Sequence, residues 1–186
     1  GAIEPERDPL RFGAFVTFFP QLVAGPILRA ADFLPQLRID PAALRLRILP
    51  GLKIFVLGLA KKLLIADSIA PYSDNVFLHT SAVTGYEAII GVLAYTIQIY
   101  CDFSGYSDMA IGLGMMMGYD ILENFRMPYL ATNITEFWRR WHMSLSSWLR
   151  DYLYISLGGN RKGETRTRVN LMLTMLIGGL WHGASW

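Results

Sequence analysis

The stretch 169–186 is an uncharged apolar run that contains one ionisable side chain, His182. Such a run is about long enough to cross a bilayer as a helix. An imidazole at membrane depth is costly unless it faces a protein interior or a water-filled cavity, so His182 is a candidate functional residue. Gly178, Gly179 and Gly183 leave room beside it for a close helix or a substrate chain. The alternative is a packed structural histidine hydrogen-bonded to a carbonyl.

The composition is that of a membrane protein. Hydrophobic residues make up 53% of the chain, charged residues 17%, and the mean hydropathy is +0.32. These values are too apolar for an ordinary soluble domain of this length. The chain begins at Gly1 without a methionine and stops inside an apolar run, so we expect a piece of a longer, multi-pass protein. The single cysteine, Cys101, excludes an internal disulfide framework and a cysteine-rich metal site, and we predict no metal site.

Lysine and arginine are confined to two blocks, 7–62 and 126–168, and are absent from 63–125. The positive-inside rule therefore predicts that both basic blocks face the cytoplasm and that the turn around 71–87, with His79, faces outward. The basic residues flank apolar segments and form no continuous polar stripe, so we expect no nucleic-acid partner.

The first half of the chain offers several candidate membrane segments. Residues 12–28 form a charge-free span candidate whose two prolines predict a kinked or early-ending helix. Residues 42–48 indicate either a short interfacial helix with snorkelling arginines or an exposed loop. Residues 49–66 are apolar but contain three lysines. The distribution of charge favours a bilayer crossing there over a surface helix, and the polar stretch 67–85 then predicts an external loop.

Residues 86–119 form a second long apolar region that we expect to be broken at 101–108. The two carboxylates in that break, Asp102 and Asp108, need partners or water at mid-depth, so the break is expected to line a cavity. Together with His182, these carboxylates also fit a different class of function. A proton-coupled transporter or channel would use the three side chains as a relay through the bilayer.

Asn133 followed by Glu136 forms an Asx version of the capping box and predicts a helix that runs to about Tyr154. Aromatic and aliphatic side chains share one face of this helix, and His142 is the one polar side chain among them. We therefore interpret His142 as either a tethered core residue or a site residue. A Gly-Gly pair is expected to end the helix, and residues 161–168 to form a hydrophilic cytoplasmic loop.

Four motifs follow one another along the chain: FFPQLVAGPILR at 18–29, YCDFSGYSDMAIGLG at 100–114, FWRRWHMSLSSWLRDYLYISLGGNR at 137–161 and GGLWHGASW at 178–186. In this order they resemble the membrane-bound O-acyltransferases, and within that family the membrane subunits of alginate O-acetylation. The resemblance covers nearly all of residues 11–186. It implies an all-α polytopic membrane fold in which a cytoplasmic donor tunnel meets an opening on the other side. Residues 1–186 would be the central and partial C-terminal portion of one such domain, without its earlier and later transmembrane helices.

The resemblance also implies that His182 is the catalytic histidine and His142 the second active-site position. It implies a place in the bacterial inner membrane and an acyl thioester, such as acetyl coenzyme A, as donor substrate with no tightly bound cofactor. The acceptor would be a polysaccharide hydroxyl or a periplasmic acyltransferase partner protein.

The residues suit this chemistry independently of the resemblance. Acyl transfer needs a base, a hydrogen-bond donor to the oxyanion and exclusion of water. Neutral His182 is suited to act as the base. His142 is suited to orient a substrate or to donate a hydrogen bond to the oxyanion. The sequence holds no Gly-x-Ser-x-Gly elbow and no His-Glu-x-x-His motif, which argues against a serine hydrolase or a zinc protease.

Overall fold

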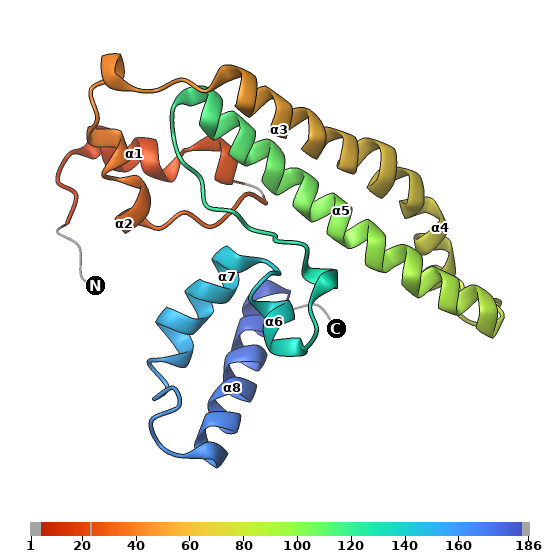
Figure 1. Ribbon diagram of the computed structural model, residues 1–186. Coiled ribbons are helices and arrows are strands. Elements are labelled where there is room, and N and C mark those ends of the chain that lie inside the picture. The colour runs from red at the N-terminus through yellow and green to blue at the C-terminus, as the bar shows by residue number, and fades with distance from the viewer. Residues whose placement is uncertain (1–4, 23, 184–186) are drawn as a thin grey trace. The chain divides into compact units, whose positions relative to one another are not determined.

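The computed structural model describes residues 5–22 and 24–183, and all regular structure within these ranges is helical (Figure 1). The prediction of an all-α fold is therefore confirmed. The chain divides into two compact units, residues 1–124 and 125–186, and each unit is described by itself. Three residues of the predicted apolar run, 184–186, lie outside the described ranges.

The first unit begins with short elements. Helix α1 covers Pro9–Val16, a 3₁₀ turn covers Phe19–Gln21, and α2 covers Ala30–Phe33. An eight-residue helix is about 12 Å long, so the prediction of a helical span over 12–28 is wrong, although the early end that the prolines predict is observed. Val23 of that segment lies outside the described residues.

An aromatic cluster joins these short elements to the end of the long helix of the unit. The rings of Phe18 and Phe33 lie 4.4 Å apart, and Phe33 lies 5.4 Å from Tyr119. The Gln36 side chain bonds both backbone groups of Asp120, with its amide donating to the carbonyl at 3.0 Å and its carbonyl accepting from the N–H at 2.7 Å. These contacts hold the loop after the long helix against the N-terminal elements.

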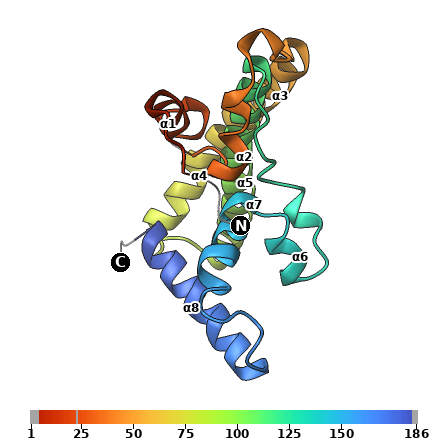
Figure 2. The same ribbon diagram turned by 90° about the vertical axis from the view of Figure 1, so that its left-hand side faces the viewer.

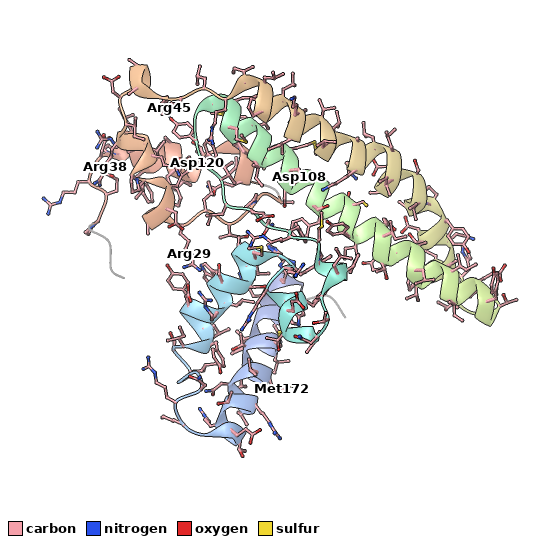
Figure 3. The ribbon with its side chains drawn as sticks, in the orientation of Figure 1. Arg29, Arg38, Arg45, Asp108, Asp120 and Met172 are labelled. Carbon is pink, nitrogen blue, oxygen red and sulfur yellow. The ribbon has the colours of Figure 1, made fainter. Side chains whose placement is uncertain are left out.

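The interfacial helix predicted over 42–48 is absent, and the alternative, an exposed loop, is correct. 3₁₀ turns occupy Gln36–Arg38 and Pro41–Ala43, and regular helix resumes at residue 48. Arg45 lies in this loop (Figure 3). Arg47 donates to the Asp120 carboxylate at 2.6 Å, so this arginine ties the loop to the rest of the unit.

A helical hairpin makes up most of the first unit. Its first arm consists of α3 (Ile48–Ala60), a π-helical segment (Lys61–Ala66) and α4 (Asp67–Leu78), and its second arm is α5 (Gly85–Met117). The arms run side by side (Figure 1). The prediction of an external loop over 67–85 is therefore wrong for residues 67–78. One polar side chain of this stretch serves helix packing, because Ser73 is fully buried and donates to Gln98 on α5.

Glycines let the two arms approach until their backbones touch. A Cβ built on Gly58 would lie 2.4 Å from the carbonyl oxygen of Gly105, and one on Gly112 would lie 2.6 Å from that of Gly51. Close approach of backbones at small residues is how helices associate where no water drives them together.

The prediction of a break at 101–108 is wrong, because α5 is continuous over all 33 of its residues. The two carboxylates find their partners on the facing arm. Lys62 Nζ lies 2.6 Å from Asp102 Oδ1, and Lys61 Nζ lies 2.6 Å from Asp108 Oδ2 (Asp108 is labelled in Figure 3). The prediction that the two carboxylates need partners is confirmed, but salt bridges supply these partners without unwinding the helix.

Among the described helices, α5 alone is long and apolar enough to count as a candidate membrane span by length and composition. Large apolar side chains stand exposed along both arms, among them Leu57 at 63%, Leu64 at 73% and Leu93 at 59%. An apolar surface of this extent marks contact with lipid or with other protein segments. Cys101 is free and buried, as expected of a small hydrophobic residue.

The second unit contains α6 (Ile134–Trp138), α7 (Met143–Trp148), a π-helical segment (Leu149–Tyr154) and α8 (Glu164–His182). The prediction of one unbroken helix over 133–154 is wrong, since the chain leaves helical geometry between α6 and α7. The predicted loop 161–168 is wrong from residue 164, where α8 begins. Figure 2 shows α8 alongside α7 and the π-helical segment, against which it packs.

Candidate active site

The N-terminus of α6 is fixed by the predicted capping residues. Asn133 Oδ1 accepts from the backbone N–H of Glu136 at 2.9 Å. The Glu136 carboxylate accepts from the backbone N–H and the hydroxyl of Thr132, one residue earlier than in the usual box. The hydrogen bonds from Thr132, with a further one from Arg140, lower the pKa of Glu136.

The chain turns sharply after α6, and His142 occupies the turn. Its backbone has φ 42° and ψ 56°, the left-handed region, which costs a non-glycine residue roughly 1–2 kcal/mol. Two backbone hydrogen bonds hold the turn: Arg126 N–H donates to the Arg140 carbonyl, and Ser146 N–H donates to the His142 carbonyl, each at 2.9 Å. Strain of this kind persists where the surrounding structure imposes it, and it concentrates at functional sites.

An aromatic wall fixes the imidazole of His142. The side chain is 7% exposed, and its ring stacks on Phe125 at 6.3 Å between centroids. Phe125 in turn meets Trp141 edge-on at 5.0 Å, and Trp141 stacks on Phe137 at 5.6 Å. The packed rings leave the imidazole little freedom to turn.

His182 is the last residue of α8 and is exposed. Its helix is held against α7 by Trp181, which stacks on Trp148 at 6.1 Å. Gly178 packs on Leu149, because a Cβ there would lie 3.2 Å from that side chain. The room that the glycines were predicted to leave for a close helix is therefore used at Gly178, while Gly179 faces open space.

The two histidines predicted as site residues meet. Their ring centroids lie 6.4 Å apart, with the ring planes at 67°. One imidazole is buried and held by aromatic rings, and the other is accessible at a helix end.

Sequence reasoning missed Phe125 and the left-handed turn. Phe125 lies between the two predicted helical regions, where no periodicity assigns it a face. The turn carries no signal either, because His142 is neither glycine nor asparagine, the residues that usually mark left-handed backbone. Trp138, Trp141 and Trp148 instead continue a helical pattern across the turn at His142.

The sequence comparisons identify the family. Residues 7–186 match the membrane-bound O-acyltransferase family. The chain is 56% identical over 180 residues to the "Probable alginate O-acetylase AlgI" of Azotobacter vinelandii, covering 97% of this chain and 36% of that protein. It is 48% identical over 179 residues to the peptidoglycan O-acetyltransferase of Helicobacter pylori, covering 95% and 34% of the two chains. It is 31% identical over 195 residues to the teichoic acid D-alanyltransferase of Bacillus subtilis, covering 96% and 48%.

The chain therefore belongs to the membrane-bound O-acyltransferase family. The resemblance drawn from the four motifs is confirmed, as is its direction toward alginate O-acetylation. The chain spans about a third of the length of the first two of these relatives and about half of the third.

Proposed function

We propose that the full-length protein is an acyltransferase that moves an acetyl group from a thioester to a hydroxyl. The observation that carries the proposal is the convergence of His142 and His182, with ring centroids 6.4 Å apart. Acyl transfer needs a base beside the alcohol and a hydrogen-bond donor beside the carbonyl oxygen, and two adjacent imidazoles supply both. Family membership and the names of the relatives support the same reaction class.

In this mechanism His182 is the general base. Its exposure at the end of α8 gives an acceptor hydroxyl access to the ring. The hydroxyl oxygen bonds to the thioester carbonyl carbon while its proton passes to the free imidazole nitrogen. When the tetrahedral intermediate collapses, the carbon–sulfur bond breaks and the imidazolium returns the proton to the leaving thiolate. The products are an O-acetyl ester and a free thiol.

His142 then orients the carbonyl and donates an N–H to the oxyanion. Its burial and its stack on Phe125 favour this division of roles. A hydrogen-bond donor that is already held in place needs no reorganisation when negative charge develops on the carbonyl oxygen. Preorganised hydrogen-bond donors therefore contribute strongly to acyl transfer. The left-handed backbone at His142 serves to aim the ring.

We further propose that the donor is acetyl coenzyme A or another acyl thioester, bound as a substrate from the cytoplasmic side. The acceptor is a hydroxyl of a surface polysaccharide, or a periplasmic acyltransferase partner that passes the group on. The relatives are named for alginate, peptidoglycan and teichoic acid, all polymers of the cell surface. The protein would sit in the bacterial inner membrane and cross it several times.

The transport reading has weaker support. A proton relay needs carboxylates that can exchange protons along a path, whereas Asp102 and Asp108 are each held by a lysine at 2.6 Å.

The test uses the full-length protein with three matched substitutions. His182→Ala should abolish acetyl transfer to polysaccharide in cells, since losing a general base costs ~10² to 10⁴ in rate. His142→Ala should also lower transfer, but less, because water can replace part of an orienting group. The control is His79→Ala, which removes the third histidine of the chain from an exposed position after α4. Acetylation near the wild-type level in folded, membrane-inserted His182→Ala would overturn the proposal.

A further inference from the structure

A row of small and polar residues runs along the buried side of α8. Asn170, Thr174 and Gly178 are buried and spaced four residues apart, and His182 continues the spacing. Residues at this spacing form a ridge that winds slowly around a helix. The large apolar residues of α8 stand outside instead, as Met172 does at 72% exposure (Figure 3).

Asn170 makes the directional contact of this row. Its side chain is fully buried, and its Nδ2 donates to the carbonyl oxygen of Gly159 at 2.8 Å. That carbonyl belongs to a turn with Gly158 at φ 109° and Gly159 at φ 55°, which closes the π-helical segment. Asn170 Oδ1 has no hydrogen-bond partner within the described ranges. A buried amide oxygen without a partner is costly, and what the buried side chain contributes in return is the directed bond to Gly159.

The other contacts of α8, with α7 and with the π-helical segment, fix the axial position of α8 less sharply. Gly178 rests on Leu149, and Trp181 stacks on Trp148. These contacts are apolar and include no hydrogen bond, so they are less directional than the bond from Asn170 to Gly159. A slip of one residue would move His182 by about 1.5 Å along the axis and turn it by about 100°.

We propose that Asn170 is a positioning residue that sets the register of α8 and so holds His182 opposite His142. The inference rests on the proposed function, because it assigns Asn170 no chemistry of its own. It acts three turns away from His182 through the rigid helix. Misplacing a catalytic group by about 1 Å can cost ~10²-fold in rate.

The experiment measures steady-state acetyl transfer by the full-length protein, normalised to the folded fraction. Asn170→Ala removes the bond to Gly159 and should lower kcat by about 10- to 100-fold with little change in KM. Asn170→Asp keeps the size but replaces the donating nitrogen with an oxygen, and should do the same. Thr174→Val is the matched control. The Thr174 hydroxyl bonds to the Asn170 carbonyl within α8, so its loss breaks no contact between segments.

A double substitution separates positioning from general weakening. In the His182→Gln background, Asn170→Ala should cost nothing further, because a positioning residue has no effect once its target is gone. An additive loss, an unchanged kcat in Asn170→Ala, or the absence of any folded Asn170 variant would each overturn the assignment. Wild-type activity in His182→Gln alone would instead overturn the proposed function, so the two failures are distinguishable.

Discussion

Replacing Gly58 by alanine should destabilise the helical hairpin. The added Cβ would lie 2.4 Å from the carbonyl oxygen of Gly105 and 2.8 Å from the backbone nitrogen of Met109, while ordinary contact begins at 3.4 Å. Both obstacles are backbone atoms that cannot rotate away, so the arms must separate by about 1 Å. Overpacking of this kind costs ~1–3 kcal/mol, and alanine returns up to ~1 kcal/mol through its helix propensity. We expect a net loss of about 1 kcal/mol in the free energy of unfolding.

The assay is thermal unfolding of the purified full-length protein in detergent, followed by tryptophan fluorescence. Gly13→Ala is the control, because Gly13 lies inside α1 and its added Cβ would meet nothing within 4 Å beyond its chain neighbours and the backbone of its own helix. That variant should unfold at or slightly above the wild-type temperature. If Gly58→Ala unfolded at the same temperature as Gly13→Ala, the close backbone packing of α3 on α5 would be refuted.

Two further predictions concern charge. Asp108→Asn should lower the yield of monodisperse protein more than Asp102→Asn, because Lys62 keeps its second salt bridge, to Asp67, when Asp102 is lost; equal yields by size-exclusion chromatography would contradict this. A cysteine at Thr165, among the exposed basic residues at the start of α8, should resist an impermeant thiol reagent added to intact spheroplasts and react after permeabilisation; labelling from outside would reverse the predicted topology.

The helical content could be predicted, and His142 and His182 could be selected as candidate site residues, because both rest on local signals. Apolar composition and spacing mark helices wherever they lie, and a histidine in an uncharged run stands out without knowledge of its neighbours. The cap at Asn133 could be predicted equally well, since a pattern of four consecutive residues defines it.

The errors came from contacts between distant residues. A carboxylate at Asp102 looks unsatisfied until the lysines of the other arm are known, and 67–78 looks like a loop until Ser73 is seen to bond Gln98. The turn at His142 was hidden because tertiary contacts impose it on residues whose own pattern favours a helix.

In the proposed reaction, His182 takes a proton from the acceptor hydroxyl. His182→Gln tests it most directly, because glutamine keeps a hydrogen-bond donor and a similar size but cannot accept a proton in this pH range. The measurement is acetyl incorporation into polysaccharide by cells that make the full-length variant at the wild-type level. We expect a loss of at least ~10²-fold. Acetylation close to the wild-type amount would contradict it.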